Sequence, residues 1–447
     1  MSELLIILPI LTLIIMAIST QKMELSLMVS SVLALVLLHR TNIVRGTLDS
    51  LYRVLSDGSF QFCIIFLVTF GIIMKLFQKS GGLQGFAELI KPLARGQRSA
   101  MVFCWIMDVV LFIDEYLDTL TVSFSMRNIT DRLGVPREHL AFHVNAMSCS
   151  LCLTIPMTSW TAFTVNLIAE KDLTYTDYVR CIPMMFYPLI MIVLCLLVAC
   201  GVFPKLGNLK KAYERTAAGG PTHIREKNEK SLVDIGELDE SNVSSAANIL
   251  LPIVVIVAGS IYFDGNMLIG LLLGMVCQFV LYMPQKLMSL DRFINNMFSG
   301  ASSMLPLLMV LFMGFLLNDC NEQLGLFDLV IRLAGSAVPK ALLPAATFLL
   351  VGGLVFATGT CWLIMLLTVP IFIPLAFEMG VDPRLILAAL LSGVALGYST
   401  CFYGDTIFLT AAGTEVSNMT IVRTTLPYAL IVLAISVAGY VALGIMM

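Results

Sequence analysis

The sequence predicts an all-α polytopic membrane protein with about ten to twelve spans, built from two related, inverted repeats with broken or re-entrant helices. Three observations support this fold class. Of the 447 residues, 58% are hydrophobic and 13% are charged, whereas soluble domains carry about 25% charged residues. Apolar runs long enough to cross a bilayer recur along the chain. The order of the segments in the first half is repeated in the second.

The first half contains six apolar runs that we expect to cross or enter the membrane. They are residues 4–19, 25–38, 60–77, 101–126, 141–168 and 178–203. The intervening 41–58 is polar, and 78–98 is amphipathic and carries basic residues, so both are expected at the membrane interface. The chain start lacks the positive region of a signal peptide, and the first run is therefore expected to be retained.

A polar stretch divides the chain near its middle, at 204–247. Its first part is basic, which predicts a cytoplasmic linker. We expect an N-terminal transmembrane half at 1–203, with a first repeat at about 60–168, and a C-terminal half at 248–447, with a second repeat at about 301–413. The apolar runs of the second half are 249–263, 267–283, 304–317, 342–357, 363–377, 385–396 and 426–445.

Three carboxylates interrupt an apolar run at Asp114, Glu115 and Asp118. A carboxylate at bilayer depth costs about 3 kcal/mol on insertion scales, and such acids usually face the protein interior and serve function. Asp114 and Asp118 share one face of a helix, while Glu115 points elsewhere. Two carboxylates on one face can bind a cation or share a proton. The alternative is that these acids cap a helix end and face solvent.

Two apolar segments contain small polar residues and are predicted to be broken helices, at 145–160 and 397–413. Unwound backbone at membrane depth is tolerated where it is buried in protein or lines a cavity. For the first segment, a continuous helix kinked at Pro156 is the alternative.

An alignment by eye relates the two halves at an offset of 241 to 245 residues. Residues 66–71 parallel 308–314, 109–114 parallel 353–358, and 159–160 fall opposite 404–405. We also expect Trp160 and Trp362 to be equivalent positions. In transporters built from two repeats, the site lies near the midplane, where interrupted segments of both repeats meet.

Basic residues flank the run 101–126 on both sides, at 91–98 and 127–137. If both flanks are cytoplasmic, the run turns back as a re-entrant hairpin with the acidic cluster at its tip. If they lie on opposite sides, the run crosses once. The sequence leaves both arrangements open.

Several motifs resemble the NhaC-type sodium/proton antiporter family of the ion-transporter superfamily. They are FIDEYLDTLTV at 112–122, MRNITD at 126–131, PREHLA at 136–141, FATGTCW at 356–362 and VRTTLPYAL at 422–430. The resemblance covers roughly residues 60–430, in one order and spacing. It implies a multi-pass secondary transporter of the inner (cytoplasmic) membrane, made of two related halves, with no ATP site and no prosthetic group.

The chain departs from the family pattern in both broken segments. Asn145-Ala-Met-Ser148 stands where the family has an Asp-Ser-Thr-Ala motif, and 397–406 lacks one acid and one His while keeping Asp405 and Thr406. The lost acids weaken a site for a hard cation. They make room for a small organic solute, a carboxylate or an amino acid, contacted by aromatic residues.

The resemblance and the buried acids together predict sodium/proton exchange, with transport of an organic solute as the alternative. The ion- or proton-binding candidates are Asp114, Asp118, Asp405 and Thr406. The candidates for lining the substrate site are Asn145, Ser148, Thr158, Ser159, Trp160, Thr358, Thr360, Tyr398, Phe402 and Tyr403. Arg423 could pair with an acid or attract an anionic substrate, or it could be a loop arginine at a span entrance.

Other functional classes receive little support from the sequence. It contains no HExxH, GxSxG or P-loop motif, so an enzyme is not expected. The alternative of an intramembrane aspartyl enzyme would need Asp114 to face Asp405. The net charge of −3 gives no basic surface for nucleic acid. The expected partners are the lipid bilayer and the transported species, no cofactor is expected, and a homodimer is left open.

Overall fold

The structure is a computed structural model. It describes residues 3–20, 23–40, 42–82, 84–85, 88, 95–112, 115–169, 171, 173–224, 243–263, 266–326, 329, 338–359, 361–402 and 404–446. Over these residues the chain is helical and has no strand, which confirms the fold class. Six helices of the described chain are long and apolar enough to cross a bilayer, and three bent pairs raise this number to as many as nine. Two further apolar helices, α13 and α14, have 16 residues each.

The helices fall into two sets that follow the same order. The first set is α1 (Glu3–Thr20), α2 (Met23–His39), α3 (Ile43–Ser56), α4 (Gly58–Ser80), α6 (Gln97–Val110), α7 (Glu115–Arg132), α8 (Arg137–Thr154), α9 (Ser159–Ala169), α10 (Tyr175–Cys181) and α11 (Phe186–Ala199). The second is α13 (Ala247–Tyr262), α14 (Met267–Tyr282), α15 (Leu290–Ser303), α16 (Leu305–Gln323), α18 (Leu343–Thr358), α19 (Cys361–Met379), α20 (Pro383–Thr400), α21 (Asp405–Thr414) and α22 (Asn418–Met446). Between the sets lies α12 (Gly207–Ala217).

The starts of corresponding helices recur at a nearly constant distance along the chain. The shift is 244 residues from α1 to α13 and from α2 to α14, 247 from α3 to α15 and from α4 to α16, and 246 from α6, α7, α8 and α9 to α18, α19, α20 and α21. This shift is close to the expected 241 to 245. Both α3 and α15 are helices although neither was predicted as one, because their polar residues interrupt the apolar pattern.

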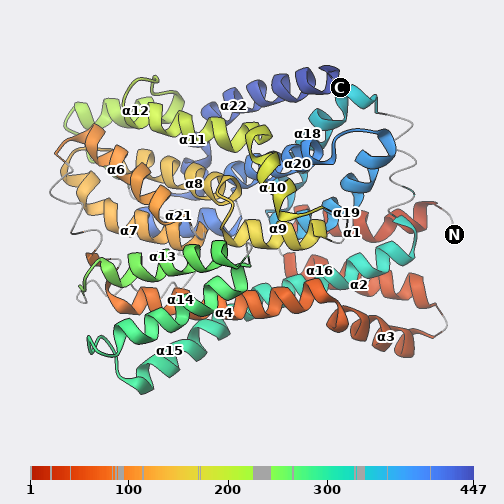
Figure 1. Cartoon of the computed structure of the whole chain (residues 1–447). Helices are drawn as coiled ribbons and strands as arrows, with labels where there is room; N and C mark the ends of the chain where they lie inside the picture. The colour runs from red at the N-terminus through yellow and green to blue at the C-terminus, as the bar shows by residue number, and fades with distance from the viewer. Residues whose placement is uncertain are drawn as a thin grey trace.

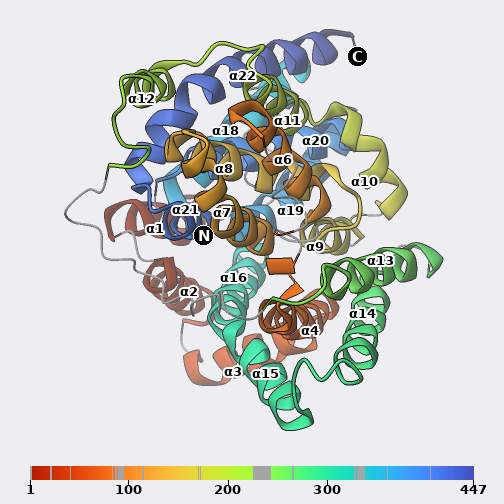
Figure 2. The same cartoon turned by 90° about the vertical axis from the view of Figure 1, so that its left-hand side faces the viewer.

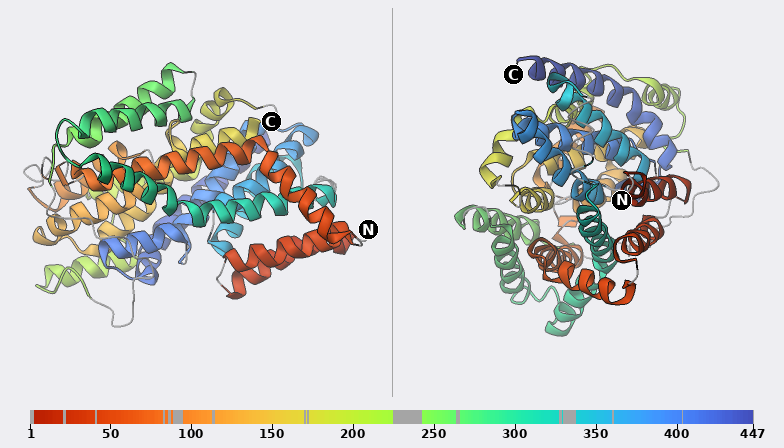
Figure 3. Two further views of the ribbon diagram at one scale, coloured as in Figure 1. Left: turned by 90° about the horizontal axis from the view of Figure 1, so that it is seen from below. Right: turned by 90° about the vertical axis from the view of Figure 1, so that its right-hand side faces the viewer.

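The two sets are interleaved in space and form two layers. Helices α1–α4 and α13–α16 form one layer, and α6–α12 with α18–α22 form the other (Figures 1 and 2). In the first layer α4 and α15 cross closely at Gly71 and Gly300. If Gly71 carried a Cβ atom, that atom would lie only 2.5 Å from the carbonyl oxygen of Gly300. Small residues allow such close contact between membrane helices. Helix α1 begins, and α22 ends, at the same end of the molecule (Figures 1 and 3).

Helices α6 and α7 form a hairpin rather than one crossing. Gln97 at the start of α6 donates from Nε2 to the carbonyl oxygen of Gly134, just beyond the end of α7, at 3.0 Å. Helix α6 ends at Val110 and α7 begins at Glu115, so the acidic cluster of the sequence starts where the two helices are joined. The re-entrant arrangement of 101–126 is therefore the one that the structure has, and it explains why both flanks of this run are basic.

Helices α18 and α19 form the corresponding hairpin in the second half. Gly380 follows the end of α19, and Lys340 precedes the start of α18. The two residues are close in space, because a Cβ atom on Gly380 would lie 3.5 Å from Nζ of Lys340. Figure 1 shows the two hairpins at opposite ends of the molecule, so that their tips approach its middle from opposite sides.

The broken helices α8–α9 and α20–α21 run antiparallel to each other. Glu415, after α21, accepts a hydrogen bond of 2.5 Å from Nη1 of Arg137 at the start of α8. At the other end, Asp177, after α9, interacts electrostatically with Arg384 at the start of α20. Each pair therefore begins where the other ends, which makes the two repeats inverted. Helix α9 is bent by 44° from α8, so the first segment is broken rather than smoothly continuous.

Candidate functional site

The hairpin tips meet the breaks of the two broken helices. Cys152 Sγ in α8 lies 3.4 Å from the carbonyl oxygen of Phe112 at the first tip. A Cβ on Gly404, in the second break, would lie 3.2 Å from the carbonyl oxygen of Gly359 at the second tip. The interrupted segments of both repeats therefore converge, as in secondary transporters whose substrate site lies at a repeat interface.

A buried cluster of two carboxyls and an imidazole lies behind the first tip. Nε2 of His143 in α8 lies 3.0 Å from Oδ2 of Asp108 in α6. Asp108 also interacts with the side chain of Asp118 in the first turn of α7. All three side chains are essentially closed to solvent. Buried charges are costly unless they are paired, so this cluster is a functional-site candidate.

A second polar connection links the first hairpin to the second broken helix. Tyr398, in the last turn of α20, donates from its hydroxyl to Oε1 of Glu115 at 3.2 Å. Thr406, in the first turn of α21, donates to the same Tyr398 hydroxyl. All three residues are buried. Of the four ion-binding candidates, Asp118 therefore lies in the cluster with Asp108, and Thr406 lies in the connection through Tyr398.

Three aromatic side chains from α9, α19 and α20 pack together. The ring of Trp160 in α9 lies 5.3 Å from that of Trp362 in α19 and 5.7 Å from that of Tyr398, measured between centroids. Both indole Nε1 groups are buried without a hydrogen-bond partner in the part of the chain that the structure describes. Trp160 and Trp362 are not equivalent, contrary to expectation. The repeat pairs α9 with α21 and α19 with α7, which places Thr406 and Tyr116 at the corresponding positions.

Several of the predicted polar residues hold the broken helices in shape. Asn145 Nδ2 donates to the carbonyl oxygen of Ser399 at 2.8 Å and so joins α8 to α20. Thr158 Oγ1 donates to the carbonyl oxygen of Cys152 and accepts the N–H of Thr161, which bridges the first break. Thr358 Oγ1 donates to Leu354 within α18.

The remaining predicted residues lie in different surroundings. Ser148 and Ser159 are buried, whereas Phe402 is half-buried and packs against Phe356 at 6.4 Å. Arg423 is exposed on α22, in keeping with the interpretation as an arginine near a span entrance. Asp114, Thr360 and Tyr403, and the side chain of Asp405, lie outside the described residues.

Sequence reasoning missed three of the buried ionisable residues. Asp108 and His143 each stand within an apolar run of the sequence and were not among the candidates, and Glu115 was expected to point away from the site. The general rule that ionisable groups at membrane depth face the protein interior would have identified all three. The spacing argument failed for Glu115 because α7 begins there, so Asp114 and Asp118 do not lie within one described helix.

A cavity of about 270 Å³ adjoins the first break, between the two layers. Pro156, Thr158 and Thr161 line one side of it, and Asn266 with Met267 at the start of α14 line the other. The cavity thus gives a small space next to residues of the broken helix. No three His, Cys, Asp or Glu side chains in the described ranges form a metal-binding group, so a transported cation would also need hydroxyl or backbone oxygens.

The chain has inverted repeats, and its two hairpins meet two broken helices with ionisable groups buried between them. These features together define a secondary transporter. The chain belongs to the Na+/H+ antiporter family, which it matches over residues 151–445, more than half of its length. It is a multi-pass membrane protein and a transporter by class.

The proteins similar to the chain include a bacterial relative and a transporter of known structure. An uncharacterized protein of Haemophilus influenzae is 25% identical over 485 aligned positions, which cover 98% of this chain and 90% of the relative. The structure also resembles that of the Alcanivorax borkumensis YdaH transporter, which has an unusual topology. That likeness has a TM-score of 0.60 at 14% identity and covers 90% of this chain and 88% of the other. At this identity the likeness concerns the fold alone.

Proposed function

We propose that the chain exchanges protons for sodium across the cytoplasmic membrane, as an antiporter of the NhaC type. The observation that carries this proposal is the buried cluster of Asp108, Asp118 and His143 behind the tip of the first hairpin. Two carboxyls that adjoin each other can hold one proton between them. A cation bound at Asp118 would compete with that proton, and competition for one site enforces exchange.

The other ion-binding candidates would complete the cation site. Thr406 reaches Glu115 through the Tyr398 hydroxyl, so a cation near Glu115 would find hydroxyl oxygens from the second repeat. Asp114 and Asp405 are proposed as further ligands, because Asp114 precedes Glu115 in the sequence and Asp405 precedes Thr406 at the start of α21. Oxygen ligands of this kind suit a hard cation.

Proton flux into proteoliposomes tests the proposal. Vesicles that contain a pH-sensitive dye and a pH gradient receive pulses of sodium, lithium or potassium, then a panel of carboxylates and amino acids. We expect a sodium-driven response that is lost in Asp118→Asn. It should persist in Asp291→Asn, a control acid exposed in the first turn of α15. An undiminished sodium response in Asp118→Asn would refute the assignment.

A second candidate function is transport of a small organic carboxylate. It is favoured by the buried indole Nε1 groups of Trp160 and Trp362, which have no partner among the described residues. A buried donor without an acceptor is costly, and a carboxylate oxygen would satisfy it. Trp160→Phe and Trp362→Phe keep the ring packing and remove the donors. We expect both to weaken uptake of the active carboxylate, whereas Trp105→Phe, whose Nε1 donates to Ile192, should not. A response to cations alone would dismiss this candidate.

A further inference from the structure

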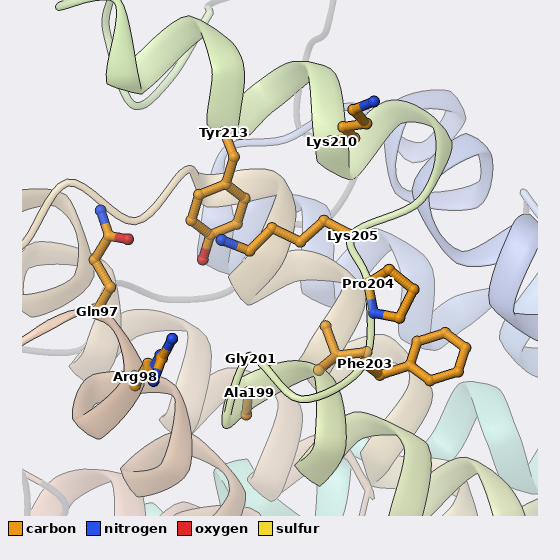
Figure 4. A pocket seen from close by; sticks show the side chains of 10 residues that line it. Gln97, Arg98, Ala199, Gly201, Phe203, Pro204, Lys205, Lys210 and Tyr213 are labelled. Carbon is orange, nitrogen blue, oxygen red and sulfur yellow. The ribbon is translucent and has the colours of Figure 1, made fainter.

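A cavity with a basic lining lies at the base of the first hairpin, away from the site described above. Its volume is about 430 Å³. The cavity is surrounded by the first residues of α6, the end of α11, the loop that follows α11, and helix α12 (Figure 4). Three cationic side chains line it, from Arg98, Lys205 and Lys210, and no acidic residue is among its described lining.

Lys205 is held in place at the cavity, and Arg98 lies against the loop that forms its wall. The Lys205 ammonium lies 3.0 Å from the centre of the Tyr213 ring, a cation–π contact that fixes its direction. Gly201, with a positive φ of 73°, leaves room for the guanidinium of Arg98, since a Cβ there would lie 3.1 Å from Arg98 Nε. Figure 4 shows the Arg98 and Lys205 side chains at the same open space.

No acid in the part of the chain that the structure describes neutralises Arg98 or Lys205. Among the described residues, no ion pair or hydrogen bond joins either Arg98 or Lys205 to an acid. Burial lowers the pKa of Lys205, and the charge of Arg98 lowers it further. Lys210 is different, because it lies 3.9 Å from exposed Glu214 on its own helix. Arg98 and Lys205 therefore repel each other across the cavity, and an anion between them would relieve that repulsion.

We propose that this cavity binds a phosphate group between Arg98 and Lys205, supplied by an anionic lipid headgroup or by a soluble phosphate compound. A guanidinium fork and an ammonium suit phosphate oxygens. Gln97 and Arg98 begin α6, and Lys210 lies in the first turn of α12, so the positive ends of two helices add to the field. Basic pockets at the ends of membrane helices accept headgroups in the same way.

Occupancy of the cavity would reach the helix that carries His143. Tyr213, which lines the cavity, has its hydroxyl 2.7 Å from Nδ1 of buried His139 in α8. His139 lies one helical turn from His143. A phosphate group bound to both Arg98 and Lys205 would therefore stabilise the packing of α12 against α6 and α8. Because it binds only the folded protein, it would also raise the free energy of unfolding by mass action.

Thermal unfolding of the purified protein in a neutral detergent tests the proposal. One series receives inorganic pyrophosphate, a second receives phosphatidylglycerol, and a third receives phosphatidylcholine. We expect a saturable rise in the unfolding temperature in the first series, the second or both, and none in the third. A rise with pyrophosphate identifies a soluble ligand as sufficient, and a rise with phosphatidylglycerol alone identifies the lipid headgroup. No rise with either anion would overturn the proposal.

A matched pair of double variants separates a built site from general charge attraction. The double variant Arg98→Gln, Lys205→Gln should raise the half-saturating concentration of the stabilising anion about tenfold or more, since each substitution removes a charge-assisted hydrogen bond to the phosphate. Arg132→Gln with Lys211→Gln removes two exposed cations outside the cavity lining and should leave it unchanged. Equal weakening in both would overturn the proposal. If the first double variant does not fold, Lys205→Gln alone is measured, and an unchanged half-saturating concentration in it would overturn the proposal too.

Discussion

Replacing Tyr398 by Phe removes one oxygen atom from the connection between the two repeats. In the native chain that hydroxyl donates to Glu115 and accepts from Thr406. The ring remains, so its packing against Trp160 at 5.7 Å should persist. The substitution therefore isolates the polar link from the aromatic packing around it.

The size of the effect follows from the bond that is lost. A hydrogen bond to a charged group contributes about 1.5–3 kcal/mol when the partner is buried. Glu115 is fully buried, so its charge would lose this donor in any state in which Glu115 is ionised. If the ionised state is the one that binds the cation, the half-saturating sodium concentration should rise by roughly tenfold to a hundredfold.

Sodium-dependent proton flux in proteoliposomes measures that concentration, and thermal unfolding measures stability in parallel. Tyr440→Phe is the matched control, because Tyr440 is also fully buried and its hydroxyl donates to Ser392 Oγ in α20 at 2.7 Å. Both variants should lose stability, and only Tyr398→Phe should lose sodium affinity. An unchanged affinity in Tyr398→Phe, or an equal loss in both variants, would refute the reasoning.

A double-mutant cycle with Thr406→Val sharpens the test. Since Thr406 acts through the Tyr398 hydroxyl, its removal should matter little once that hydroxyl is gone. Strictly additive effects on sodium affinity would mean that the two residues act separately.

Three further predictions concern other parts of the molecule. Asp114→Asn should abolish exchange and leave membrane insertion intact, as measured by flux and by the amount of protein in the membrane fraction; normal flux would remove Asp114 from the mechanism. Cysteines at Gln97 and Lys340, both exposed, should react with an impermeant reagent from opposite sides of the membrane, and labelling from one side would contradict the inverted hairpins. Burial opposes ionisation of Glu415, but the hydrogen bond from Arg137 and nearby positive charges outweigh it and lower the pKa of Glu415. Its contribution to stability is therefore present above the unfolded value of 4.5 and is lost as the pH falls below it, so Glu415→Gln should lower the unfolding temperature at pH 7 and bring little change near pH 3.

The architecture was largely predictable because it depends on patterns that the sequence shows directly. The run 101–126 with basic flanks required either a hairpin or a violation of the charge rule, and the hairpin is what the structure has. The interrupted segments, recognised from their small polar residues, are broken after Thr154 and after Thr400. Both observations depend on local sequence alone.

The composition of the site was harder to predict because it depends on which helix faces meet. Asp108 and His143 are 35 residues apart on different helices, and nothing in the pattern of either helix indicates their contact at 3.0 Å. The linker prediction had the same limit. Helix α12 lies inside 204–247, and its Arg215 forms a 2.8 Å ion pair with Glu138, which a count of polar residues does not reveal.

The two repeats share a scaffold and differ in chemistry. At the shift of 246 residues that relates α6–α9 to α18–α21, Asp108 corresponds to Leu354, Glu115 to Cys361, and His143 to Ala389. Every ionisable group of the described cluster therefore belongs to the first repeat, whereas the second supplies the hydroxyls of Tyr398 and Thr406 that reach it. We infer that protonation changes in this cluster of the first repeat are sensed by the second repeat through the phenolic oxygen of Tyr398. That arrangement would let an inverted, symmetric framework carry an asymmetric exchange reaction.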